Sequence, residues 1–138
     1  MNTDQIHELL GQGFHCSQIL MKAGMEYLEK DDPDLLRAMN GLAGGLGGCG
    51  RNCGALTGGV CMFGLFAGRG TPEEAENPML SEMVSEYLAW FEETFGSPDC
   101  DTILEGDRQN IPRVCPGLIE NAVEKATELL REHGCLPA

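Results

Sequence analysis

The chain has 138 residues and seven cysteines, and these thiols are the side chains best suited to carry chemistry. A thiolate can attack a disulfide, and it can ligate zinc or the iron of an iron–sulfur cluster. An odd number of cysteines argues against a framework of structural disulfides, and the same density in a reducing cytosol favours metal binding or redox work. The seven are Cys16, Cys49, Cys53, Cys61, Cys100, Cys115 and Cys135.

Four of these cysteines fall at or within the first turn of a predicted helix. They are Cys16, Cys53, Cys100 and Cys115. Unsatisfied amide N–H groups and the helix dipole stabilise a thiolate at such a position. We therefore expect these four to share one site as metal or cofactor ligands, or as the redox-active thiols if no metal is bound. Cys53 is then the expected attacking group.

Glycine surrounds Cys53. Residues 41–61 read GLAGGLGGCGRNCGALTGGVC, with nine glycines and three cysteines. This composition predicts a loop over residues 44–52, because glycine in a helix interior costs about 1 kcal/mol relative to alanine. Glycine has no Cβ, so backbone amides can come close to a sulfur atom or a cluster. The stretch lacks the Gly-Lys-Ser/Thr ending of a phosphate-binding loop, which disfavours a nucleotide role.

The elements that hold these residues are predicted to be helices, since apolar residues recur at helical spacing and no run alternates as a strand does. We predict an all-α fold, a single compact domain over residues 1–138 with five to seven helices and a glycine-rich loop at the cysteine site. Residues 54–68 are apolar and small, which predicts a buried central helix. Ser97 is the predicted cap of the helix that holds Cys100, and Cys115-Pro116 is expected to open the last helix.

The segment CGALTG at residues 53–58 matches the CGAxxG signature of a known family. The chain resembles the C_GCAxxG_C_C family of redox-active cysteine proteins from about Gly13 to Leu130. The likeness extends to Cys-Ser-Gln at Cys16, to Phe-Gly-Ser followed by Cys100, and to Cys-Pro at Cys115. It implies a redox role for the same four cysteines. A similar domain occurs in split-Soret cytochromes, which carry an iron–sulfur cluster, but this chain has no CxxCH motif for haem.

Three cysteines lie outside this signature. Cys49 precedes Cys53 by four residues and is a candidate resolving thiol or additional cofactor ligand. Cys61 lies within the predicted central helix and is expected in the core. Cys135 follows Gly134, the predicted helix stop, and is expected to be exposed.

Three functions fit the four cysteines. The first is an iron–sulfur cluster for electron transfer or sensing. The alternatives are a thiol–disulfide redox protein without metal and a non-catalytic adaptor with a structural zinc site. The chain has no C-x2-C motif to separate them, and whether it is an enzyme stays open.

The chain is acidic, with 22 Asp and Glu against 9 Lys and Arg, a net charge of −13. Eleven of the acids lie in residues 73–107, which contain no Lys or Arg. This charge repels phosphate backbones, so we expect no nucleic-acid partner. We expect no membrane span, because no apolar run is long enough, and the N-terminus does not read as a signal peptide. We therefore expect a cytoplasmic protein with an unidentified redox partner protein, and homodimerisation is left open.

Overall fold

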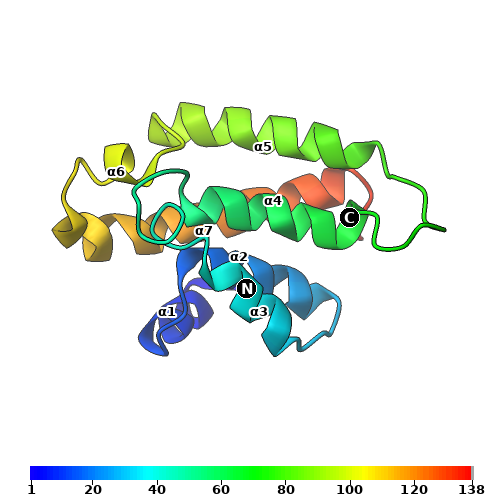
Figure 1. Ribbon diagram of the computed structural model, residues 1–138, viewed down its shortest axis with the longest axis horizontal. Coiled ribbons are helices and arrows are strands. Elements are labelled where there is room, and N and C mark those ends of the chain that lie inside the picture. The colour runs from blue at the N-terminus through cyan, green and yellow to red at the C-terminus, as the bar shows by residue number, and fades with distance from the viewer. Residues whose placement is uncertain (138) are drawn as a thin grey trace.

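The computed structural model describes residues 1–137 and is all-α, as predicted (Figure 1). These residues form seven α-helices and one short 3-10 helix, η1. The elements are α1 (Thr3–Gly11), α2 (Cys16–Tyr27), α3 (Pro33–Asn40), α4 (Gly54–Ala67), α5 (Met79–Phe95), α6 (Cys100–Ile103), η1 (Arg108–Asn110) and α7 (Ile111–Glu132). The glycine-rich stretch before α4 is a loop, also as predicted.

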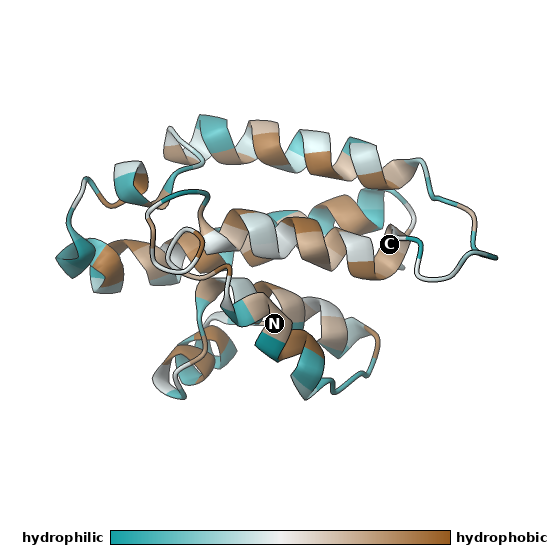
Figure 2. Cartoon of the chain, in the orientation of Figure 1, coloured by the Kyte–Doolittle hydropathy of each residue, from teal (hydrophilic) through white to brown (hydrophobic). Residues whose placement is uncertain are grey.

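Helix α4 is the central element, and it packs against α2, α5 and α7. Figure 2 shows it in white and brown over most of its length, whereas α5 and α7 carry polar stripes as well. Ala55, Met62 and Phe63 of α4 are fully buried in the main core. The low helix propensity of its glycines is therefore offset by tertiary packing, which supplies most helical stability in proteins.

Glycines on α4 allow α2 and α5 to approach its first two turns. A Cβ on Gly58 would lie 2.9 Å from the Cα and the carbonyl oxygen of Ser17 in α2. A Cβ on Gly59 would lie 2.5 Å from the ring of Tyr87 in α5. The Tyr87 hydroxyl donates a hydrogen bond of 2.7 Å to the carbonyl of Ala55, which ties α5 to the first turn of α4. Both neighbours are thus fixed close to Cys53.

Buried polar bonds attach the start of α2 to α3. The Ser17 hydroxyl donates to the carbonyl oxygen of Met39 at 2.8 Å, and the Gln18 amide donates to that of Leu36 at 3.1 Å. The Gln18 side chain also accepts a hydrogen bond from the backbone N–H of His15, the N-cap of α2, at 3.1 Å. The first turn of α2, where Cys16 lies, is therefore held on two sides.

Two predicted helix starts were wrong. Helix α7 begins at Ile111, four residues before Cys115. Pro112 favours this start, because the N–H groups of a first turn make no intrahelical hydrogen bond and proline therefore loses none there. Pro116 consequently lies inside α7. Helix α6 has Asp99 as its N-cap, and not Ser97, whose hydroxyl instead accepts a hydrogen bond of 3.0 Å from the N–H of Asp99 in the preceding turn.

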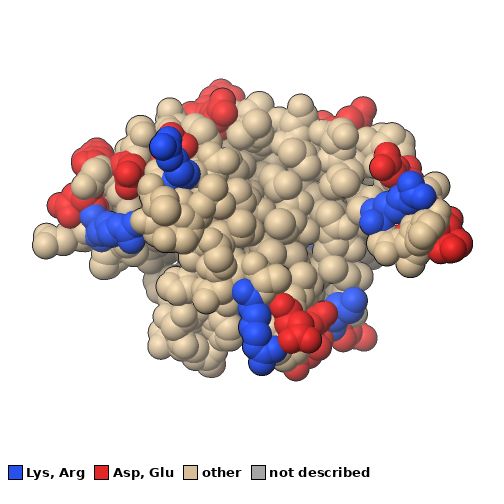
Figure 3. Space-filling model, viewed as in Figure 1, with Lys and Arg blue, Asp and Glu red and all other residues tan. Residues whose placement is uncertain are grey.

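Charged side chains lie mostly toward the rim of the face in Figure 3, and the middle of that face, over α4, is uncharged. Within residues 1–137, no helix combines the length and the apolar character that crossing a membrane requires.

Candidate functional site

Four cysteines from four separate segments line one cavity of about 330 Å³. Cys16 is the first residue of α2, and Cys53 is the N-cap of α4. Cys100 is the first residue of α6, and Cys115 lies one turn inside α7. The fold thus brings together the four cysteines that the sequence analysis assigned to one site, although only three of them stand at a helix start.

The glycine-rich loop, residues 41–53, is hydrogen-bonded to the segment that leads into α6. The N–H of Cys53 donates to the carbonyl of Pro98 at 2.7 Å, and the N–H of Cys100 donates to the carbonyl of Arg51 at 2.7 Å. An isolated antiparallel bridge lies between these two bonds. Because this bridge and its flanking hydrogen bonds join the two segments, they hold the backbones of Cys53 and Cys100 together.

The same loop brings its backbone to the cavity and to the sulfur of Cys16. Gly44 and Gly48 line the cavity, and the backbone of Gly44 acts on the Cys16 thiol and lowers its pKa. The close folding of the loop requires glycine at position 45, where φ is +76° and a Cβ would lie 2.4 Å from the backbone nitrogen of Arg51. The abundance of glycine beside reactive sulfur thus has a steric cause.

Glycine in the CGAxxG motif has a second steric cause. A Cβ on Gly54 would lie 2.4 Å from the sulfur of Cys16 and 3.4 Å from the backbone nitrogen of Ser17. The Cys16 sulfur therefore rests directly on the first residue of α4, immediately after Cys53. Any larger residue at position 54 would displace this sulfur.

Burial raises the pKa of all four cavity thiols. For Cys53, burial and the neighbouring Cys16 raise the pKa to about 12, and the N–H groups of Ala55 and Leu56 lower it by less. For Cys115, burial followed by the charges of Cys16 and Cys100 raises the pKa to about 11. The expectation that helix starts would make these thiols acidic was wrong, because the loss of hydration outweighs the amide N–H groups.

The other two cavity thiols follow the same pattern. Burial raises the pKa of Cys16, against hydrogen bonds from the N–H groups of Ser17 and Gly44. Burial also raises the pKa of Cys100, while the guanidinium of Arg108 lowers it and the carboxylate of Asp101 raises it. All four groups are therefore neutral thiols near pH 7 in the metal-free protein.

The remaining cysteines lie apart from this cavity. Cys49 is exposed on the loop and is not among the described residues that line the cavity. Cys61 is half-buried and packs against a small cluster that includes Met39. Cys135 was expected to be exposed but is half-buried against the main core, because the chain turns back after α7 and the Cys135 N–H donates to the carbonyl of Leu130 at 2.8 Å.

The sequence analysis did not assign most of the other residues that line the cavity. Its walls are largely apolar, and His15 and Arg108 are its charged or titratable members besides the cysteines. The sequence signal for Arg108 was weak, since it is merely the first cation after the stretch 73–107. The additional lining side chains are Leu10, Phe14, His15, Ala43, Leu104, Arg108, Ile111, Leu118 and Ile119.

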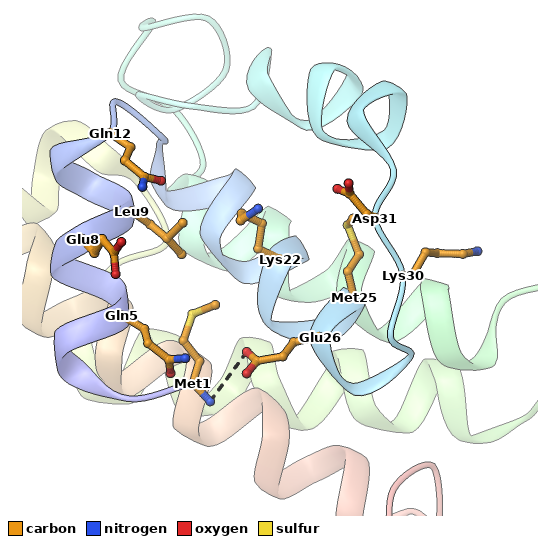
Figure 4. A pocket seen from close by; sticks show the side chains of 10 residues that line it. All are labelled: Met1, Gln5, Glu8, Leu9, Gln12, Lys22, Met25, Glu26, Lys30 and Asp31. Carbon is orange, nitrogen blue, oxygen red and sulfur yellow. Dashed lines mark ion pairs between the residues drawn. The ribbon is translucent and has the colours of Figure 1, made fainter.

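A second cavity of about 330 Å³ lies between α1 and α2 (Figure 4). Its lining is mixed and polar, with Glu8, Lys22 and Glu26 among its side chains, and none of the described residues that form it is a cysteine. Figure 4 shows the lining side chains spread along α1, α2 and the segment that follows α2, with an ion pair of 4.0 Å between the Met1 amino group and Glu26. This second cavity therefore offers no thiol for redox or metal chemistry.

The donor set of the cysteine cavity fits an iron–sulfur cluster, since four cysteine thiolates are the usual ligands of both [2Fe–2S] and [4Fe–4S] centres. Four zinc ligands, in contrast, meet about 2.3 Å from a single point, whereas these thiols are four of the sixteen residues that line a space of about 330 Å³. Among residues 1–137, no three His, Cys, Asp or Glu side chains are already arranged around a single metal ion.

A family model described as "Putative redox-active protein (C_GCAxxG_C_C)" matches residues 14–129, which is most of the chain. The chain belongs to this family. The match covers almost the same range as the resemblance read from the sequence, and it includes all four cavity cysteines of this C_GCAxxG_C_C protein. No curated protein and no solved structure matches the chain.

Proposed function

We propose that the four cavity cysteines of this redox-active family member bind an iron–sulfur cluster that serves electron transfer or sensing. The observation that carries the proposal is that Cys16, Cys53, Cys100 and Cys115 reach one cavity from four different segments. A dithiol centre needs two thiols, and a third and fourth around the same space favour a cofactor with four ligands.

Electrostatics supports a bound cofactor with positive charge. The negative charges of Cys16 and Cys100 each raise the pKa of both Cys53 and Cys115. Four thiolates would therefore repel one another in a largely apolar space. Iron bound in a cluster would offset this repulsion, and the cluster would supply one-electron transfer when bound.

Backbone amides of the chain would tune such a centre. The backbone N–H group of Gly44 lowers the pKa of Cys16, and those of Ala55 and Leu56 lower the pKa of Cys53. Hydrogen bonds to ligand sulfurs stabilise the more negative state and raise a reduction potential. The apolar walls, among them Phe14 and Leu118, would limit access of water.

The test is metal and sulfide analysis of protein purified without oxygen. Wild-type protein is expected to contain iron and acid-labile sulfide and to absorb visible light. Cys53→Ser should lose most of both, whereas Cys135→Ser should retain them, because Cys135 follows α7 at the opposite end of the fold from α6 (Figure 1). Equal levels of iron and sulfide in both variants would refute the cluster, and so would the absence of both from the wild type. Cys49→Ser in the same series tests that residue as an additional ligand.

A thiol–disulfide function is the second candidate, and one contact favours it. The Cys16 sulfur rests on Gly54, the residue that follows Cys53, so Cys16 and Cys53 are the natural pair. In that case the purified protein would contain neither iron nor sulfide, and mild oxidation would remove two free thiols and join two of the cavity cysteines. Zinc without sulfide would instead indicate the adaptor with a structural metal site.

A further inference from the structure

The lining of the cysteine cavity differs in charge from the molecule as a whole. The chain carries a net charge of −13, yet none of the described residues that line this cavity is acidic. Arg108 is its one permanently charged lining residue, and its side chain is exposed at η1. An anion that the rest of the surface repels would therefore find a local attraction at this opening.

The guanidinium of Arg108 is held in place across the opening. It donates a hydrogen bond to the carbonyl of Gly48, 60 residues away in the chain. Its terminal nitrogens also lie 3.5 and 3.7 Å from where a Cβ of Gly48 would stand. Of the four cavity thiols, Cys100 is the one whose charge interacts with that of Arg108. The cation thus shares the cavity lining with Cys100 and acts on that thiol, against the neighbouring carboxylate of Asp101.

We propose that Arg108 makes the cavity mouth a recognition site for small organic anions that carry a disulfide, and that it directs them to Cys100. The apolar walls, including Phe14, Leu104 and Ile111, suit a ligand with an apolar body. The inference rests on the proposed redox role of the cavity cysteines, and it concerns the protein without a cluster, in which the thiols are free.

The reaction balances with the disulfide as the oxidant. The Cys100 thiolate attacks one sulfur of the bound RS–SR, its S–S bond breaks, one RS⁻ leaves, and a Cys100–S–SR bond forms. A second cavity thiolate then attacks the Cys100 sulfur, releases the second RS⁻, and forms a disulfide within the protein. Two cysteine thiols are oxidised by two electrons in total, two protons pass to the solvent, and the small disulfide is reduced to two thiolates.

The test compares two aromatic disulfides of different charge, the dianionic dithiobis(nitrobenzoate) and the neutral dithiodipyridine. Both react with the reduced, cluster-free full chain in which Cys49, Cys61 and Cys135 are replaced by Ser, so that only cavity thiols respond. The quantity measured is the ratio of the two bimolecular rate constants. Arg108→Gln is expected to lower this ratio roughly three- to tenfold through the anionic reagent alone, which is about the size of the attraction between two close unit charges in water.

Three controls make the result specific. Arg108→Lys should keep most of the anionic preference, and Arg113→Gln should change the ratio little, because Arg113 is exposed on α7 and does not line the cavity. Higher salt should reduce the wild-type ratio, since screening weakens an exposed charge. Cys100→Ser should abolish the fastest phase of the reaction with either reagent. In the protein that keeps Cys100, mass spectrometry should find the first mixed disulfide on that residue.

Several outcomes would overturn the proposal. They are an unchanged ratio in Arg108→Gln, an equal loss in Arg113→Gln, and a fast phase that persists without Cys100. The ratio cancels general damage to the fold, because both reagents meet the same thiols. The absence of iron and sulfide from anaerobically purified protein would refute the cluster but would leave this ratio unaffected, so the two proposals fail separately.

Discussion

Two glycines of α4 should respond in opposite directions to replacement by alanine. Alanine gains about 1 kcal/mol over glycine inside a helix. At Gly64, among residues 1–137, nothing lies within 4 Å of the added Cβ, so this gain is kept in full. At Gly58, the Cβ would lie 2.9 Å from the Cα and carbonyl oxygen of Ser17, which are backbone atoms that no rotamer change can remove.

The cost at Gly58 is therefore that of forcing α2 away from α4. Overpacking of this kind costs about 1–3 kcal/mol, and the rigid backbone contact places the cost at the upper end. After the gain in helix propensity, we expect Gly58→Ala to lower the free energy of unfolding by about 2 kcal/mol, and Gly64→Ala to raise it by about 1 kcal/mol. In a domain of this size, these changes correspond to a fall in Tm of roughly 6–8 °C and a rise of roughly 3–4 °C.

The assay is urea unfolding of the reduced, metal-free protein, followed by circular dichroism, with the thermal midpoint as a second measure. Gly58→Ala should also increase alkylation of the cavity thiols, because Ser17 adjoins Cys16 at the start of α2. If the two variants change stability in the same direction, α2 and α4 do not approach as closely as the contact at Gly58 requires, and the steric explanation of the glycines on α4 is wrong.

The other predictions concern a buried hydroxyl and alkaline pH. Tyr87→Phe leaves the carbonyl of Ala55 without the 2.7 Å hydrogen bond and should lower the free energy of unfolding by about 1–2 kcal/mol in urea, whereas Tyr27→Phe, at an exposed ring, should change it little. Because burial raises the pKa of Cys53 from 9.0 to about 12, the folded protein binds this proton more tightly than the unfolded chain does. The resulting stabilisation is complete below about pH 9 and is lost as the pH rises toward about 12. Metal-free Cys53→Ala should therefore lose less stability than wild type between about pH 8 and pH 11 in urea titrations, and an unchanged slope would contradict the raised pKa.

Local sequence signals predicted much of the helical framework. An aspartate followed by proline is typical of a helix start, and α3 begins at Asp32-Pro33, where the Asp32 carboxylate accepts the Leu35 N–H at 3.1 Å. Residues 54–68 predicted the buried α4, because apolar and small residues leave no polar face to meet solvent. Such signals succeed because caps, glycine stops and apolar periodicity act within one or two turns of a helix. The prediction for the start of α7 was wrong, because Pro116 looks locally like a first-turn proline although the helix has already begun at Ile111.

The types and order of the cysteines, and with them the family, were determined by the sequence itself. The sequence could not determine the charge state of those thiols, because a helix start favours a thiolate whereas burial disfavours it, and burial depends on neighbours far away in the chain. Only the tertiary structure decided that Cys49 lies outside the cavity and that the sulfur of Cys16 packs against Gly54. It also decided that Arg108 donates a hydrogen bond to the carbonyl of Gly48, 60 residues away in the chain. These are relations between segments that the backbone brings together, and no local pattern encodes the distance between them.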